Sequence, residues 1–222
     1  ASLSPGVFAQ QANGQRNVIS RISPGEDLFG YLNRTGGVFD KQRFAQLLGI
    51  ANEFKEGDDT LGLAAADESS RRHARTLLSR TRIDRVEAHS LLDDELFQFN
   101  QSRVDPKRRQ SIAQWTFGDL KQFLLSRDEA EIHGIMPGLS SEAIGCVVKI
   151  MTNDELIAVG RRIFNPLPGS HIGARGYLGA RIQPNSPTDN VDDICWQVFD
   201  GWSYAVGDVL LGTNPVSSDP QS

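Results

Sequence analysis

The sequence has few cysteines and no long apolar run. Among its 222 residues, Cys146 and Cys195 are the two cysteines, and neither stands at metal-ligand spacing from a second thiol. We expect both to be small buried hydrophobic residues in a reducing compartment rather than a disulfide. No stretch of the sequence comes close to about 18 consecutive apolar residues, the length that indicates a transmembrane helix. The first residues, ASLSPGVFAQ, also lack the basic and apolar segments of a secretory signal.

An excess of positive charge is also missing. The chain has 23 Lys and Arg against 28 Asp and Glu, a formal net charge of −5, so little is available to neutralise nucleic-acid phosphates. We interpret Arg71, Arg72 and Arg75 as a solvated helix face, and we expect His73 and His89 at the surface. The four histidines show no metal-ligand spacing. The sequence therefore predicts no nucleic-acid partner, no membrane contact and no metal site made by its own side chains.

Residues up to about 163 carry the signals of short helices. Asp40 is predicted to cap a helix whose apolar residues recur at helical spacing until Gly57. Pro106 suits a first helical turn, Thr116 is predicted to cap the next helix, and Thr152 with Glu155 makes a capping box. Further helices are expected over 69–79, from Ile83 or Asp84, over 93–104 and over 142–151. We therefore predict a helical domain over 41–163, preceded by an N-terminal extension over 1–40.

The chain changes character after this helical region. Residues 164–177 are rich in glycine and proline, and we interpret them as a linker, although a Gly-rich stretch can also let backbone approach a ligand. A strand over 178–183, a helix over 190–204 and a strand over 208–212 follow. A strand, a helix and a second strand of these lengths predict a βαβ unit with parallel strands and a right-handed crossover. The helix has an apolar stripe that includes Trp202, which we expect in the core.

Three polar side chains stand where the two predicted strands end. Arg181 and Gln183 are two apart, so the strand pleat places both on one face, with Ile182 on the other. Asn214 follows the apolar run of the second strand, at the kind of strand end where α/β enzymes build active sites. A structural interpretation is also open, with Arg181 in an ion pair and Asn214 as a turn residue before Pro215. From the residues alone, the structural interpretation is favoured.

The predicted sheet is too small to be a complete domain. A parallel sheet needs both faces covered, and two strands cannot achieve that alone. The part of the chain after Tyr177 is also far shorter than the about 250 residues of a closed (β/α)₈ barrel. We therefore expect a truncated chain or one part of a larger assembly.

Specific motifs give the chain a family resemblance. The segments ARIQPN and GWSYAVGDVLLGTNPV resemble the start of the catalytic barrel in the large subunit of ethanolamine ammonia-lyase, an adenosylcobalamin-dependent enzyme. Upstream segments follow the helical N-terminal region of that family in order, among them GDDTLGLAAADESS, QWTFGDLKQFLLS and GLSSEAIGCVVKIMTNDEL. The resemblance covers nearly everything from about Phe44 onward. It implies an α/β fold, with a helical N-terminal region followed by the first strands of a (β/α)₈ TIM-type barrel over 178–222, incomplete in this chain.

The resemblance also implies a function. In this family ethanolamine is deaminated by radical chemistry to acetaldehyde and ammonia, and the coenzyme supplies the radical. By resemblance, Arg181 and Asn214 bind the substrate hydroxyl and Gln183 contacts the migrating amino group.

The same resemblance implies partners and a setting for the chain. The implied partners are ethanolamine or a related small amino alcohol, the small subunit of the lyase, and further copies in an oligomer. The implied location is the cytoplasm, including a bacterial microcompartment. Carboxylates that complete the site would lie beyond Ser222, so this chain alone is expected to be inactive. The alternative is a non-catalytic assembly module derived from the family, which the retention of the polar trio argues against.

Overall fold

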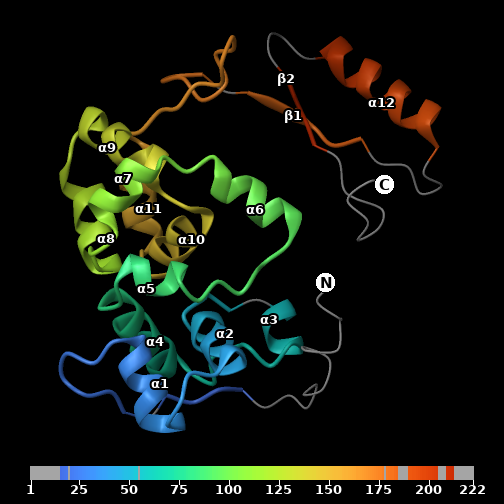
Figure 1. Ribbon diagram of the computed structural model, residues 1–222. Helices are drawn as coiled ribbons and strands as arrows, with labels where there is room; N and C mark the ends of the chain where they lie inside the picture. The colour runs from blue at the N-terminus through green and yellow to red at the C-terminus, as the bar shows by residue number, and fades with distance from the viewer. Residues whose placement is uncertain are drawn as a thin grey trace. The chain divides into compact units, whose positions relative to one another are not determined.

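The computed structural model describes residues 16–19, 21–54, 56–177, 179–184, 190–204 and 209–212. The chain divides into two compact units, Ala1–Arg162 and Ile163–Ser222, and each is described by itself (Figure 1). None of the helices in these ranges is long and apolar enough to cross a membrane.

The first unit is a series of short helices joined by short connections. In chain order they are α1 (Leu28–Gly36), α2 (Lys41–Ile50), α3 (Glu56–Thr60), α4 (Glu68–Ser79), α5 (Ile83–Glu87), α6 (Glu95–Ser102), α7 (Pro106–Ile112), α8 (Phe117–Ser126), α9 (Glu129–Ile135), the 3₁₀ turn η3 (Met136–Gly138), α10 (Ser141–Lys149) and α11 (Asn153–Gly160). The predicted tandem of helices is confirmed.

Capping side chains determine where several of these helices begin. Asp40 accepts a hydrogen bond from Arg43 N at 2.7 Å and caps α2 as predicted. Thr116 and Thr152 each form the capping box that starts α8 and α11. Such side chains satisfy backbone N–H groups that have no partner within the helix. The predicted end of α2 was wrong, because the helix stops at Ile50 and the side chain of Phe54 is largely exposed.

Helix α1 lies in the stretch that the sequence suggested was an extension. Asp27 caps it by accepting from Gly30 N at 2.6 Å, and Leu28, Phe29 and Leu32 are buried. The helix packs on α2 and α4 (Figure 1). Its burial means that α1 contributes to the same core as the helices that follow it.

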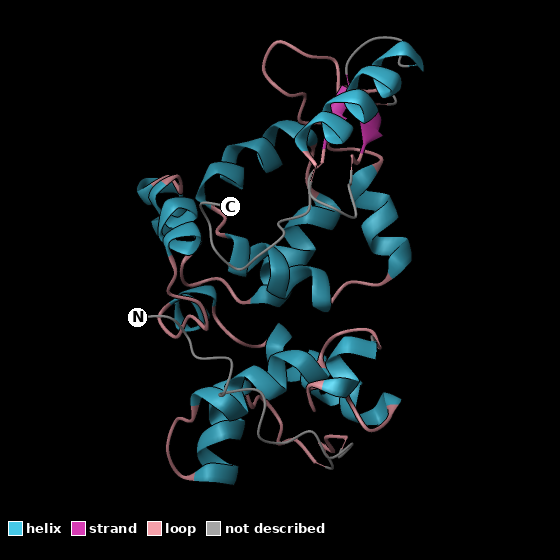
Figure 2. Ribbon diagram, turned by 90° about the vertical axis from the view of Figure 1, so that its right-hand side faces the viewer, coloured by secondary structure: helices cyan, strands magenta, loops and turns pink. Residues whose placement is uncertain are grey.

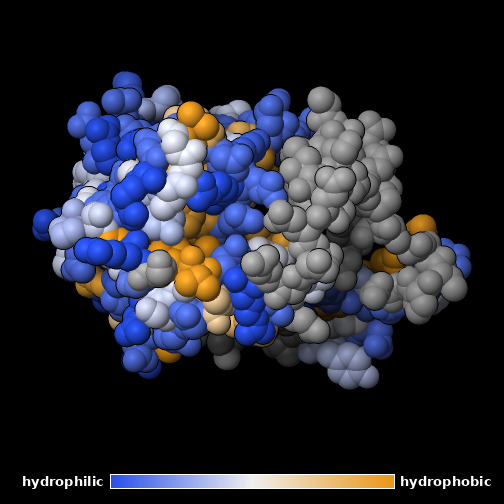
Figure 3. Space-filling view, turned by 90° about the horizontal axis from the view of Figure 1, so that it is seen from below, coloured by the Kyte–Doolittle hydropathy of each residue, from blue (hydrophilic) through white to orange (hydrophobic). Residues whose placement is uncertain are grey.

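The core of the first unit is centred on α4 and α8. Leu77 and Leu78 of α4 and Phe117 and Leu120 of α8 are completely buried. Helix α4 contacts α1, α2 and α8, while α8 also contacts α10 and α11. Burying each of these side chains contributes about 1.5–3 kcal/mol relative to leaving it in water. Where the residues are coloured by hydropathy, the face seen from below is mainly hydrophilic, with apolar areas between the hydrophilic side chains (Figure 3).

Two predictions about polar surface residues were wrong. Arg75 donates to the Ala51 carbonyl at 2.9 Å and to Glu53 Oε1 at 2.6 Å, and Arg71 also pairs with Glu53. Arg71 and Arg75 therefore tie α4 to the segment that follows α2, whereas Arg72 is exposed as predicted. The ring of His89 packs against Phe29 and against a second phenylalanine of an aromatic cluster, so His89 is not a free surface residue.

A buried carboxylate connects three other helices. The side chain of Glu87, at the end of α5, is only 4% exposed. It accepts from Arg109 Nε of α7 at 2.8 Å and from Ser140 Oγ, the cap of α10, at 2.5 Å. A charged group at such a depth requires partners of this kind, since an unpaired buried charge is strongly destabilising. Nearby, burial raises the pKa of Glu142 on α10.

The second unit contains a parallel βαβ arrangement. Strand β1 (Ala180–Ile182) pairs with β2 (Val209–Leu211), and α12 (Val191–Tyr204) lies between them in sequence. Figure 2 shows α12 lying across the two strands. Ile182 packs so closely on Gly201 of α12 that a side chain at Gly201 would collide with it. The βαβ prediction is confirmed.

The outer face of α12 is more exposed than expected. Trp202 is 49% exposed and contacts Phe199 edge-on, so its placement in the core was wrong for the described residues. Cys195 is exposed, which corrects the expectation that both cysteines are buried; Cys146 is buried. Apolar residues do recur along α12 at helical spacing. The two strands, however, cover only the face that contains Ile194, Val198 and Gly201.

Candidate functional site

Side chains alternate between the two faces of β1, and this places the candidate site residues on the face away from α12. Ile182 contacts α12, which covers that face of the sheet. Arg181 and Gln183 therefore occupy the opposite face, as the period of two predicts. Both residues are exposed, which leaves this face accessible in the described unit.

The end of β2 provides the surface on which Arg181 rests. Arg181 pairs with Leu210 in the parallel register, and Gly212 N donates to the Ile182 carbonyl at 2.9 Å. The Nε and Nη2 atoms of Arg181 would each lie 2.6 Å from a Cβ atom placed on Gly212. Because no real Cβ atom tolerates that separation, the guanidinium can occupy this position only above a glycine. The side chain of Arg181 thus extends from β1 and places its guanidinium at the carboxyl end of β2.

The other two candidates are placed less completely. Gln183 follows β1 directly and is exposed beside the buried Pro184. Asn214 lies outside the described residues, two positions beyond Gly212 in sequence. The structure therefore brings Arg181 to the end of the second strand, and the convergence of all three side chains stays a prediction.

Sequence reasoning missed the role of Gly212. The sequence alone does not give the strand register, in which Leu210 is the partner of Arg181 and Gly212 lies on the same face of β2 as Leu210. A long side chain on one strand can reach a glycine on its neighbour, because the glycine leaves the space empty.

The glycine-rich segment before β1 makes contacts within itself. Leu167 N donates to the Ile172 carbonyl at 3.0 Å, and Gly173 adopts a φ of 87° that favours glycine. His171 stacks on Tyr177 with ring centroids 4.7 Å apart. Arg175 lies over Phe164 at 4.6 Å from its centroid. These contacts support the interpretation of the segment as a connecting loop.

Metal binding by clustered side chains is not indicated in the described ranges. They contain no group of three or more His, Cys, Asp or Glu residues that could hold a metal ion. Burial raises the pKa of the Cys146 thiol to about 12, so this cysteine stays protonated and inert. The functional candidate in the described part of the chain is therefore the polar face at the strand ends.

Two parallel strands joined by a covering helix, with the Arg181 guanidinium at the carboxyl end of β2, form an α/β unit of the kind that commonly binds ligands at its strand ends. Residues 39–222 match the family described as "Ethanolamine ammonia lyase large subunit (EutB)", and the chain belongs to this family. Helix α1 lies before the matched region.

Individual relatives agree with the family match. The chain is 31% identical over 196 residues to the ethanolamine ammonia-lyase large subunit of Escherichia coli strain K12. It is 30% identical over 196 residues to that of Salmonella typhimurium strain LT2. In each case 84% of this chain and 43% of the relative are covered, so the chain spans less than half the length of these curated relatives.

Proposed function

We propose that this chain is the N-terminal part of an ethanolamine ammonia-lyase large subunit, and that the complete enzyme converts ethanolamine to acetaldehyde and ammonia. Family membership supports the reaction class. The observation that carries the site proposal is the Arg181 guanidinium above Gly212, at the carboxyl end of β2.

The residue types suit a small amino alcohol. The Arg181 guanidinium is permanently charged and presents several N–H donors, so it can hold the substrate hydroxyl oxygen. We assign the same oxygen to Asn214 as a second donor. The Gln183 carbonyl can accept a hydrogen bond from the substrate ammonium group. The three residues would bind and orient the substrate.

We further propose that β1, α12 and β2 begin a (β/α)₈ barrel over 178–222. In such a barrel the face opposite the helices becomes the interior, and this is the face that carries Arg181. Leu210 and Leu211 are 41% and 50% exposed here, and the further strands and helices of a barrel would cover them. Residues 164–177 would be the linker, 41–163 the helical domain, and 1–40 an N-terminal extension whose α1 packs with that domain.

The coenzyme and partners complete the proposal. When bound, adenosylcobalamin would supply the radical that the protein side chains cannot generate. The described strand-end groups, Arg181 and Gln183, suit a small polar substrate rather than a corrin ring, so we assign no residue of this chain to the coenzyme. A small subunit and an oligomeric assembly, in the cytoplasm or a bacterial microcompartment, form the proposed setting. The chain by itself is proposed to be inactive.

The site proposal is tested in the complete enzyme with Arg181→Ala. Loss of a preorganised donor costs about 2–4 kcal/mol of transition-state stabilisation, which lowers kcat/KM by about 30-fold to 1000-fold. Gly212→Ala retains every polar group but displaces the guanidinium, and it should lower kcat/KM in the same direction.

Arg161→Ala is the matched control, because it removes an exposed arginine from the first unit. Its kcat/KM should equal that of the wild type. Wild-type turnover by Arg181→Ala, with unchanged circular dichroism, would contradict the assignment.

A further inference from the structure

A pocket in the first unit lies between α1, α2 and the chain segment that precedes α1. Its volume is about 110 Å³. Four apolar side chains line it and are almost completely buried: Ile19, Leu32, Leu47 and Ile50. A cavity of this size accommodates about four to six non-hydrogen atoms, since one of about 150 Å³ holds benzene.

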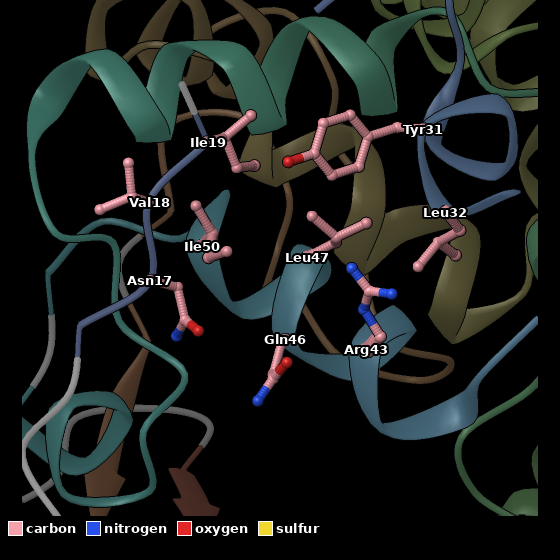
Figure 4. Close-up of a pocket in the computed structure, with 9 residues that line it drawn as sticks. All are labelled: Asn17, Val18, Ile19, Tyr31, Leu32, Arg43, Gln46, Leu47 and Ile50. Atoms are coloured by element: carbon pink, nitrogen blue, oxygen red, sulfur yellow. The ribbon is translucent and has the colours of Figure 1, made fainter. Parts of the chain in front are cut away.

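Two hydrogen-bond donors reach the same pocket. Figure 4 shows the Tyr31 hydroxyl directed between Ile19 and Leu47, and the Arg43 guanidinium close to Leu47. Burial raises the pKa of Tyr31, against the opposing effect of two nearby arginines, so the hydroxyl keeps its proton at neutral pH and can donate it. Within the described ranges, that hydroxyl makes no hydrogen bond to a protein group.

The position of Arg43 is fixed from the end of α1. Its Nη2 atom donates to Thr35 Oγ1 at 3.1 Å, and Nη1 lies directly against Gly36. A Cβ atom on Gly36 would collide with this nitrogen, so the glycine makes room for the guanidinium. The arginine is thus held against the end of α1, beside the pocket that it lines.

We propose that this pocket binds a small aliphatic carboxylate. A permanent cation and a neutral hydroxyl donor match a carboxylate, which accepts hydrogen bonds from both. The exposed Val18 side chain and the edges of the four buried apolar side chains would contact a short hydrocarbon body, which a fully hydrated inorganic anion does not offer. Five of the nine pocket-lining residues, those before α2, also precede the family match, which begins at residue 39. The site is thus independent of the proposed strand-end chemistry.

Butyrate is a suitable probe, because it has a short chain, one carboxylate and a size that fits the pocket. The experiment is a titration of the chain, labelled at its isoleucine and leucine methyl groups, followed by nuclear magnetic resonance. We expect saturable shifts at Ile19, Leu47 and Ile50 with a millimolar dissociation constant, as for other ligands of so few atoms. Butylamine has the same body and the opposite charge, and it should produce no saturable shift.

Three variants separate this site from general attraction of anions. Arg43→Gln should weaken butyrate binding by about tenfold or more, the usual effect of losing a charged hydrogen bond. Gly36→Ala keeps the charge and displaces the guanidinium, so it should also weaken binding. Lys41→Gln removes an exposed charge from the same helix, outside the pocket, and should change the constant by less than about twofold.

Several outcomes would overturn the proposal. They are the absence of saturable shifts at the pocket methyl groups, equal binding of butylamine, or unchanged affinity in both Arg43→Gln and Gly36→Ala. A spectrum that stays as dispersed as that of the wild type shows that a variant is folded. If Arg43→Gln fails this control, Gly36→Ala decides the question, because the colliding atom is the end of a flexible side chain.

Discussion

Thr81 provides the strongest single test of how the first unit is held together. Its side chain is completely buried between α4 and α5. The hydroxyl donates to the Leu77 carbonyl at 2.8 Å and accepts from Leu28 N, the first backbone amide of α1, at 3.0 Å. One hydroxyl therefore joins the end of α4 to the start of α1, over a sequence separation of 53 residues.

Thr81→Val keeps the shape and removes both hydrogen bonds. The Leu28 amide becomes a buried donor without a partner, because Leu28 is only 1% exposed and water cannot replace the hydroxyl. Such an orphaned group costs about 1–3 kcal/mol of folding free energy. With a urea m-value of about 2 kcal/mol/M, a loss of about 2 kcal/mol lowers the midpoint by about 1 M.

The measurement is urea unfolding followed by far-ultraviolet circular dichroism, which reports the helices of this unit. Thr76→Val is the matched control, since Thr76 Oγ1 makes the same kind of bond, to the Arg72 carbonyl at 2.8 Å, at an exposed position. Its midpoint should stay within about 0.3 M of the wild type, as for most surface substitutions. Equal midpoints for the Thr81 and Thr76 variants would refute the reasoning.

Two further predictions concern the cysteines and the glycines. Ellman's reagent should modify one thiol per native chain, the exposed Cys195, and two thiols after denaturation, because Cys146 is buried with its pKa raised to about 12. Rapid modification of both thiols in the native chain would show that α10 is not packed as described. Gly138→Ala should unfold or strongly destabilise the first unit, since a Cβ atom there would lie 2.5 Å from backbone atoms of Arg108 and Arg109. Gly145→Ala points into open space within α10 and should instead stabilise by about 1 kcal/mol, so equal thermal midpoints for the two variants would contradict the packing.

Local signals predicted much of the fold because they act within a few residues. Thr116 and Thr152 start their helices through side chains three positions away, and the sequence alone indicates both. The strand pleat likewise placed Arg181 and Ile182 on opposite faces. The capping box of Asp128 and Glu131 that starts α9 was equally visible, and it was overlooked.

Features that depend on distant residues could not be predicted in this way. Helix α1 is short, and it is stabilised by Thr81, which is far away in sequence. Arg75 looks solvated until the fold brings Glu53 beside it. For Trp202, the helical period identifies an apolar face but not the elements that would cover it. The Arg181 guanidinium could be placed at the strand end only once the register put Gly212 within reach.

The central claim is that this chain is part of an enzyme that acts on ethanolamine with adenosylcobalamin. The most direct test is an ultraviolet-visible spectrum of the protein purified from its complete locus, recorded with adenosylcobalamin before and after ethanolamine is added, together with an acetaldehyde assay. The account predicts spectral changes of cobalt–carbon bond cleavage that depend on ethanolamine, and acetaldehyde as a product. An unchanged spectrum without acetaldehyde, from a protein that contains all its subunits and is folded, would contradict it and favour the non-catalytic assembly module.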